Sequence, residues 1–278
     1  MQYSGQARKA APDGEGLLVV PRSVMMSEIS WDEYQRRIDG EDAIVLLPVG
    51  AVEQHGLHLP LGTDWMMATY MARRAAENVG GIVAAPISYG YRSQVRTGGG
   101  AHRLGTTNLD GTTIISLVKD VLKEFARHGA RKIAVVDGHF ENRFYLDEAC
   151  HLAVRELEYA GITNTKILKM IYAERIRPET LDVIYAGTQF PGLDLEHAGI
   201  LETAMMLYCY PELVDRSRIA DEGVAKFPPY DLFPGNPDWV PASGALSPAT
   251  VATAEMGKVL VEEFVELVTD SLRAEFRS

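Results

Sequence analysis

The sequence predicts a single α/β domain with a mainly parallel β-sheet flanked by helices. Short, continuously apolar runs of strand length recur along the chain, and longer segments with apolar residues at helical spacing lie between them. Strands that alternate with helices are joined by right-handed crossovers and form a parallel sheet. The 278 residues suffice for one large domain, and no change in composition divides them into two.

The N-terminal part is expected to be a loosely ordered extension over residues 1–23, with the folded domain over residues 24–278. Residues 1–15 are mostly polar and lack the apolar core of a signal peptide. The first helix is expected to begin after Ser30, because Ser30 is a candidate N-cap and Glu33 stands in the capping-box position. This helix should end near Gly40.

The strands are predicted from apolar runs that are too short for helices. The run 43–49 is apolar throughout and is closed by Gly50, which is typical of a strand buried on both faces. Including this run, strands are expected over residues 43–49, 81–87, 132–136 and 166–171.

The helices between the strands are predicted from apolar residues at helical spacing. The clearest pattern covers residues 112–128, and Gly129 is the expected C′ residue. Other helices are expected over residues 65–76, 142–159, 199–209 and 247–276. Residues 174–195 and 227–235 are interpreted as irregular segments, and a loop as long as the first is usually functional or disordered.

Composition excludes some classes of partner. The net charge of -11, from 38 acidic and 27 basic residues, would repel the phosphates of a nucleic acid. No apolar run is long enough to span a bilayer, so no membrane role is expected. Cys150 and Cys209 lie in predicted helices, which fits reduced, buried thiols in a cytoplasmic protein.

A loop after the apolar run 43–49 carries three candidate metal ligands, Glu53, His55 and Asp64. Carboxylate and imidazole groups are ligands that zinc and manganese accept. Alone, this stretch is weak evidence, because Glu-x-His often occurs by chance. Asp64 also precedes a helical pattern, so its simplest role would be that of a helix N-cap.

A second strand end repeats this layout. The run 132–136 leads into Asp137-Gly138-His139-Phe140-Glu141. Polar residues at the carboxyl ends of parallel strands converge at one edge of the sheet. Two histidines and three carboxylates exceed the needs of one tetrahedral ion, and a bridging Asp would suit two ions about 3.5 to 4 Å apart. The leading hypothesis is a two-metal hydrolase, although satisfied polar residues at strand ends would give the same pattern.

Glu196 and His197 form another candidate pair, at the start of the apolar helix 199–209 and after a long loop. An imidazole in this position could carry a proton to a leaving amine. An ordinary helix-start residue would look the same, and the local sequence does not separate these two interpretations.

Taken together, these motifs resemble the creatininase (creatinine amidohydrolase) family, and the resemblance covers residues 27–274. It rests on the following segments: Leu47-Pro48-Val49-Gly50-Ala51-Val52-Glu53-Gln54-His55-Gly56, Gly98-Gly99-Gly100, Gly105-Thr106-Thr107, Leu109-Asp110-Gly111, Asp137-Gly138-His139-Phe140-Glu141-Asn142, Glu196-His197-Ala198-Gly199, Glu202-Thr203 and Phe227-Pro228-Pro229-Tyr230-Asp231.

The resemblance implies a parallel sheet flanked by helices, two zinc or manganese ions in each subunit, hydrolysis of an amide C–N bond and a hexamer. One ion would be held by Glu53, Asp64 and His139. The other would be held by His55, Asp64 and Glu141, with Asp64 bridging. A hydroxide between the ions would be the nucleophile.

The same resemblance implies catalytic roles for further residues. His197 would be the proton shuttle, with Glu196 beside the substrate and Glu141 counted with the catalytic groups. Substrate contacts would come from Thr97, Gly138, Phe140, Ala173, Leu193 and Asp194.

Four of these substrate-side positions depart from the family pattern. Aromatic residues are expected in creatininase at the positions of Ala173 and Leu193, a tyrosine at Phe140 and a serine at Thr97. These changes alter both the shape and the polarity of a pocket. We therefore predict hydrolysis of a different small, cyclic amide, lactam or imide, with creatinine a weak substrate or none.

Two alternatives stay open. The first is a deformylase or peptide-trimming hydrolase of cofactor biosynthesis, as some relatives are. The second is a ligand-binding protein without catalytic activity, although such a protein would have no reason to keep five metal-compatible side chains and a proton shuttle.

Overall fold

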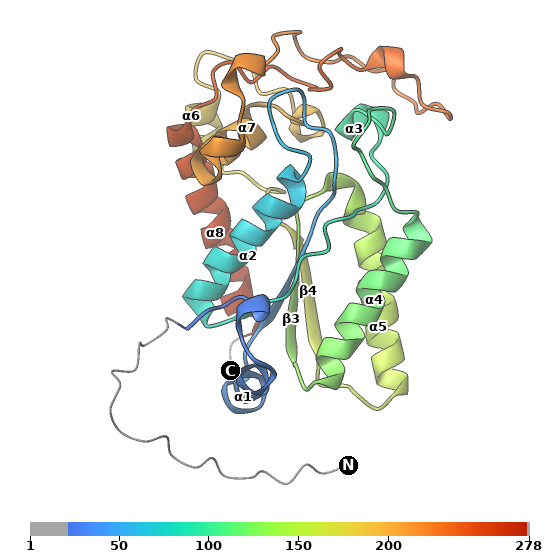
Figure 1. Cartoon of the computed structure of the whole chain (residues 1–278), viewed down its shortest axis with the longest axis vertical. Coiled ribbons are helices and arrows are strands. Elements are labelled where there is room, and N and C mark those ends of the chain that lie inside the picture. Colours follow the sequence, from blue (N-terminus) through green and yellow to red (C-terminus); the bar gives the residue numbers. More distant parts are fainter. Residues whose placement is uncertain (1–21, 277–278) are drawn as a thin grey trace.

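The computed structural model describes residues 22–276 and contains one parallel sheet (Figure 1). Its four strands lie in the order β2-β1-β3-β4, and every neighbouring pair is parallel. The strands are β1 (Val45–Val49), β2 (Ile82–Val83), β3 (Lys132–Asp137) and β4 (Lys166–Ile171). The predicted single α/β domain with a parallel sheet is confirmed. Most of the predicted extension 1–23 lies outside the described residues.

Eight α-helices accompany the sheet in this part of the chain. They are α1 (Trp31–Glu41), α2 (Thr63–Val79), α3 (Val95–Gly98), α4 (Gly111–Arg127), α5 (Arg143–Tyr159), α6 (Pro178–Ile184), α7 (Ile200–Cys209) and α8 (Ala254–Phe276). Across residues 22–276, no helix combines the length and hydropathy needed to cross a bilayer.

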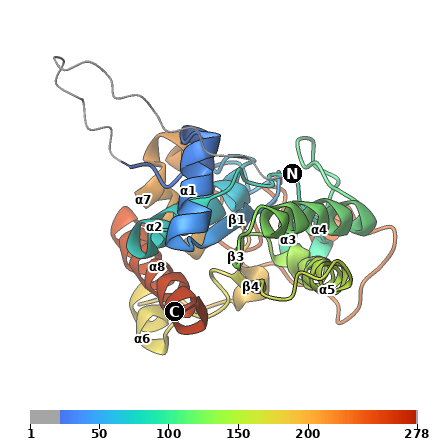
Figure 2. The ribbon, with the colours of Figure 1, turned by 90° about the horizontal axis from the view of Figure 1, so that it is seen from below.

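The helices cover the sheet on both faces, which explains the continuous apolar run of β1. Leu46 of β1 points into a core built with α2, α7 and α8. Val45 and Leu47 point the opposite way, into a second core built with α4 and α5. Successive side chains of a strand point to opposite faces, so a strand covered on both faces must be apolar at every position. Figure 2 shows the two helical layers on either side of the sheet.

The segment 174–195 was expected to be irregular, and this prediction was wrong for α6. The first turn of α6 is held by Glu263 of α8, whose carboxylate accepts hydrogen bonds from the backbone N–H of Arg177 and the hydroxyl of Thr180. Ile184 is fully buried. The contact comes from a residue more than 80 positions away, and the local signal for α6 was Pro178 at its first position.

The predicted start of the first helix after Ser30 is confirmed, whereas α2 begins earlier than predicted. Ser30 is the N-cap residue of α1, but its hydroxyl bonds to the Asp32 carboxylate and not to the helix backbone. The N-cap of α2 is Gly62, so Asp64 lies within the first turn of that helix. The Asp64 side chain is therefore free to serve the site described below.

The strand order places a crevice beside β1. The chain leaves β1 for β2 on one side, while β3 lies on the other side. In open α/β sheets, this reversal of direction creates a crevice at the carboxyl ends of the strands. The two motifs with histidine and carboxylate residues follow β1 and β3, so both reach this crevice.

Candidate metal centre

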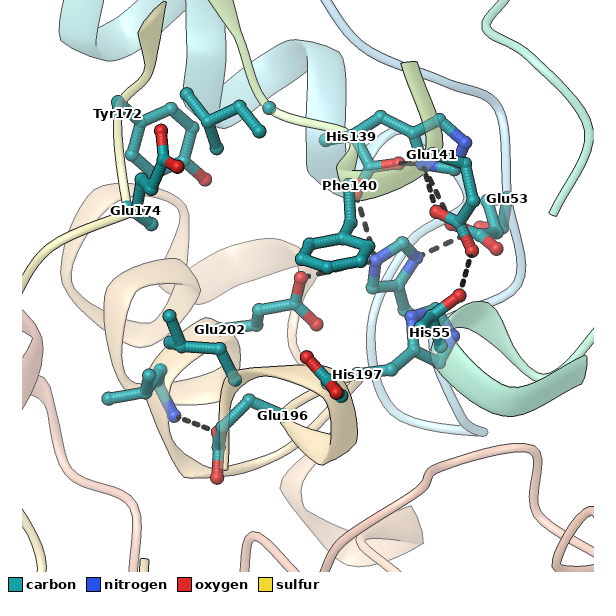
Figure 3. Close-up of a pocket in the computed structure, with 18 of the residues that line it drawn as sticks. Glu53, His55, His139, Phe140, Glu141, Tyr172, Glu174, Glu196, His197 and Glu202 are labelled. Carbon is teal, nitrogen blue, oxygen red and sulfur yellow. Dashed lines mark hydrogen bonds and ion pairs between the residues drawn. The ribbon is translucent and has the colours of Figure 1, made fainter. Parts of the chain in front are cut away.

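The structure brings the five predicted metal ligands together at the carboxyl ends of β1 and β3, and Figure 3 labels Glu53, His55, His139 and Glu141 among them. Glu53 and His55 lie in the loop after β1, Asp64 in the first turn of α2, and His139 directly after β3. All four are almost completely buried. Glu141 lies in the short 3₁₀-helix Phe140–Asn142, and its side chain is also buried.

The His139 imidazole presents one nitrogen to three carboxylates. Its Nε2–H donates to the backbone carbonyl of Tyr91, 3.0 Å away. A neutral imidazole carries one N–H, so Nδ1 is left with a lone pair. This Nδ1 lies 3.0 Å from Asp64 Oδ2, 3.2 Å from Glu53 Oε2 and 3.5 Å from Glu141 Oε2.

His55 repeats the arrangement with its nitrogens exchanged. Its Nδ1–H donates to the backbone carbonyl of Glu53, 3.1 Å away. The other nitrogen, Nε2, lies 2.9 Å from Asp64 Oδ1 and 3.5 Å from Glu202 Oε1. Lone pairs that face carboxylate oxygens repel them unless a positive charge lies between. A backbone carbonyl that fixes the second nitrogen is the usual support of a metal-binding histidine.

The buried atoms of this cluster fit a divalent cation. Glu53 Oε1, His55 Nε2 and Asp64 Oδ2 are buried and make no hydrogen bond of acceptable geometry. Unpaired buried polar atoms are costly, and coordination to a cation would satisfy them. The ligand atoms form groups whose members lie within 4.8 Å of one another, and two of the groups are Glu53–His139–Glu141 and His55–Asp64–Glu202.

Electrostatics favours positive charge at the centre of the cluster. Burial raises the pKa of Glu53 to about 7, although the His139 imidazole opposes this. For Asp64 the balance is reversed: burial acts to raise its pKa, but the nearby imidazoles of His55 and His139 outweigh it and lower the pKa. The pKa values of both histidines are raised, because neighbouring carboxylates outweigh the effect of burial.

Glu202 is a candidate ligand that the sequence interpretation did not identify. Its Oε2 accepts a hydrogen bond from the backbone N–H of Ala198, 2.6 Å away, which directs Oε1 toward His55. One local signal was present, since Glu202 is the single charged residue of the apolar helix α7. A lone carboxylate in such a helix needs a partner.

Glu141 is held in place by the loop that contains α3. Its Oε1 accepts hydrogen bonds from the Thr97 hydroxyl, at 2.5 Å, and from the backbone N–H of Gln94, at 3.1 Å. In this arrangement Glu141 groups with His139 and Glu53, while the family resemblance places it beside His55. The loop approaches closely because residue 98 is glycine: a Cβ there would lie 2.1 Å from Glu53 Oε1.

His197 lies against the same cluster, with its ring centroid 4.3 Å from that of His55. Its Nε2 lies 2.7 Å from the backbone carbonyl oxygen of Gln54 and 2.9 Å from the side-chain Nε2 of that residue. The amide hydrogens of Gln54 point to the carbonyls of Gly98 and Gly244, so His197 must donate its own Nε2–H. Nδ1 is therefore the basic nitrogen. Burial, reinforced by His55, lowers the pKa of His197 well below its ordinary value.

Glu196 faces the cavity but is engaged by the start of α7. Its Oε2 accepts a hydrogen bond from the backbone N–H of Leu201, 2.9 Å away, and the hydroxyl of Ser247 lies 3.5 Å from Oε1. Burial raises the pKa of Glu196 to about 7. These contacts tie Glu196 to the start of α7, directly beside the turn that carries His197.

A cavity of about 340 Å³ opens from the cluster. All the residues expected to contact substrate line it: Thr97, Gly138, Phe140, Ala173, Leu193 and Asp194. Tyr172, Glu174 and Arg143 line it as well, and sequence reasoning did not assign them a role. Figure 3 shows the Phe140 side chain among the residues that line the pocket.

Known proteins share this fold and these motifs. The family model Creatininase, described as creatinine amidohydrolase, matches residues 27–272. The creatinine amidohydrolase of Pseudomonas putida is 43% identical over 256 residues, which cover 92% of this chain and 98% of that protein. A mycofactocin precursor peptide peptidase of Mycobacterium ulcerans is 29% identical over 238 residues, covering 80% of this chain and 81% of that protein.

Solved structures agree with this relationship. A manganese form of creatininase superposes with a TM-score of 0.90 at 42% identity, covering 92% of this chain and all of that one. A mutant creatininase of Zn-Zn type gives the same TM-score, identity and coverage. The family match spans most of the sequence, and the similarity extends over nearly the full length of the Pseudomonas protein. The chain therefore belongs to the creatininase family of amidohydrolases.

Proposed function

We propose that this protein is a hydrolase that holds two divalent metal ions and cleaves an amide C–N bond in a small, cyclic nitrogen compound. One observation carries the proposal. Two buried imidazoles each donate one N–H to a backbone carbonyl and direct the other nitrogen at carboxylates, and Asp64 presents one oxygen to each imidazole. This shared carboxylate favours a pair of ions.

The ligands divide into two groups around Asp64. Glu53, His139 and Asp64, with Glu141 at 3.5 Å from the imidazole, would hold one ion. His55 and Asp64 would hold the other, and the distances favour Glu202 as their partner. The assignment of Glu141 to His55 stays a prediction from family resemblance. The mixture of nitrogen and oxygen donors suits zinc or manganese.

Bound in these groups, the ions would lower the pKa of a water molecule and polarise the amide carbonyl. The side chains of the protein would then transfer protons and orient the reacting groups. His197 is held neutral, and its Nε2–H is fixed on the carbonyl of Gln54. Its Nδ1 would accept a proton from the attacking water and, because the pKa is low, release it readily to the leaving amine.

The cavity wall supports a substrate other than creatinine. Ala173, Leu193 and Phe140 present apolar surface and no hydrogen-bonding group to the cavity. At these three positions the wall offers no partner to a polar ring atom, so the shape and polarity of the cavity differ from those expected for a creatinine site. We expect lactams, hydantoins or imides to be better substrates than creatinine.

The test is metal content together with hydrolysis. Purified protein is reconstituted with Mn²⁺ or Zn²⁺ and assayed on hydantoins, creatinine, lactams, imides and formamides. The variants His139→Ala and Asp64→Asn should lose metal and activity together. If either variant retained both ions and full turnover, the two-metal proposal would be wrong.

Peptide trimming is the second candidate, because mycofactocin precursor peptide peptidases are among the relatives. Release of residues from a peptide, together with inactivity on every small ring, would favour it, and activity on formamides alone would favour a deformylase. Binding of a ring without any product would favour a ligand-binding protein. The hexamer and the cytoplasmic location stay predictions. Light scattering would measure the number of subunits in the oligomer.

A further inference from the structure

A second cavity of about 630 Å³ lies directly beside the one at the metal centre. The two cavities share five lining residues: Thr97, Phe140, Glu141, Arg143 and Asp194. We call the second cavity the outer chamber. Glu141 belongs to the ligand cluster and also lines the outer chamber, so the outer chamber adjoins the metal site.

Aromatic rings form much of the wall of the outer chamber. Phe140, at the boundary with the metal cavity, is 42% exposed, and Phe144 on the first turn of α5 is 74% exposed. Tyr145 is stacked on Tyr91, with ring centroids 3.7 Å apart and planes inclined by 27°. Exposed aromatic surface gathered around a cavity is typical of a binding site. The stacked tyrosines give this wall a fixed shape.

The charges around the outer chamber argue against an anionic ligand. Arg143 pairs with Glu174 at 2.7 Å, and Arg96 lies 3.7 Å from Asp231. Asp194 adds a further exposed carboxylate to the wall. Both arginines that line the outer chamber lie near carboxylates of the protein, so neither is available to pair with a carboxylate or phosphate of a ligand. The chamber is therefore suited to an uncharged group with a flat, apolar surface.

We propose that the outer chamber is a substrate subsite for an uncharged aromatic substituent, placed while the cyclic amide lies at the metal centre. This inference rests on the proposed function. The substituent would leave the metal cavity past Phe140 and pack on Phe144. An apolar cavity of about 150 Å³ suffices to bind benzene in an engineered protein, so the outer chamber has ample room for one ring. The substrate class is thus an aryl-substituted or arylalkyl-substituted cyclic amide.

The experiment compares hydantoin with 5-benzylhydantoin on the metal-loaded protein. Dissociation constants are measured by calorimetry and hydrolysis by product analysis, for the wild type, Phe144→Ala and Tyr159→Ala. Tyr159 is a matched control, because it is an 82% exposed aromatic at the opposite end of the same helix. Oligomer size is followed by light scattering for all three proteins.

We expect 5-benzylhydantoin to bind at least about tenfold more tightly than hydantoin, since a ring would be buried against aromatic surface. The Phe144→Ala variant should reduce this preference about fivefold, and Tyr159→Ala should leave it unchanged. Equal affinities for the two compounds in the wild type would overturn the subsite. So would a Phe144→Ala variant that changed oligomer size but not the preference, because the aromatic surface would then be a subunit contact.

The two proposals fail in different ways. If hydantoin is hydrolysed but the benzyl group brings no preference, the proposed function stands and the subsite is overturned. If the benzyl compound binds with the expected preference but no compound of the wider assay panel is cleaved, the chamber is an aromatic-binding site and the proposed hydrolysis is overturned.

Discussion

The imidazole of His197 donates its Nε2–H to the backbone carbonyl of Gln54 over 2.7 Å, while the side chain of Gln54 ties together two other loops. That side chain donates to the carbonyls of Gly98 and Gly244, each at 3.0 Å, and its oxygen accepts from the backbone N–H of Gly56. The backbone carbonyl of Gln54 sets the tautomer of His197, and the buried side chain of Gln54, which does not line the cavity, fixes the position of the loop that carries this carbonyl.

The first prediction concerns this positioning residue. Gln54→Ala should leave the protein folded but lower kcat about a hundredfold, because small displacements of a catalytic group carry costs of that order. KM should change much less. Gln35→Ala, an exposed glutamine on α1, is the matched control. A Gln54→Ala enzyme with normal kcat would contradict the assigned role of His197 or its dependence on Gln54.

The second prediction separates Glu202 from an ordinary helix residue. Glu202→Gln keeps an oxygen to accept from Ala198 but loses the charge near His55. We expect one ion to bind 10 to 100 times more weakly while the other is retained, measured as metal content after dialysis against a graded chelator. Glu212→Gln, an exposed glutamate, should keep both ions. If Glu202→Gln kept both ions, Glu202 would not be a ligand. Glu141 would then be the third ligand of the ion held by His55 and Asp64.

Much of this site was predictable because its signals are local. The loops after two buried strands carry Glu53, His55, His139 and Glu141. The carboxyl ends of parallel strands lie at one edge of the sheet, so residues in these loops come together whatever the details of packing. Asp64 was a nearby candidate ligand, and the family resemblance gave it the bridging role; it lies two residues beyond the N-cap Gly62 of α2.

The missed features depend on contacts between distant segments. Glu202 reaches His55 only because α7 packs beside the loop after β1, and α6 is held by Glu263 of α8. The outer chamber combines residues of α5 with Phe227 and Asp231 from the loop after α7. Local sequence does not show which distant segments come into contact, although the lone charge of Glu202 in the apolar helix α7 was a signal that this residue needs a partner.

The third prediction concerns the two cysteines. Burial raises the pKa of both Cys150 and Cys209 to about 12, from an ordinary value of 9.0. Only the thiolate reacts with iodoacetamide, so at pH 8 the native thiols should react about a thousandfold more slowly than in denaturant. Raising the pH to 10 should speed the native reaction about tenfold for each pH unit. Mass spectrometry of Cys150→Ser and Cys209→Ser assigns each site, and fast native labelling at pH 8 would refute the prediction.

The fourth prediction tests how closely the strand ends must approach α2. A Cβ at Gly138 would lie 2.4 Å from the backbone oxygen of Asp64, so Gly138→Ala must push the start of α2 away from β3. Overpacking of this kind typically costs about 1 to 3 kcal/mol, and Tm should fall by about 2 to 4 °C for each kcal/mol. The displaced Asp64 should also bind metal more weakly. Gly40→Ala is the control, because a Cβ at Gly40 meets nothing within 4 Å and alanine favours the helix, so its Tm should rise slightly. If Gly138→Ala kept its Tm and metal content, the close contact between β3 and α2 would not be what positions Asp64.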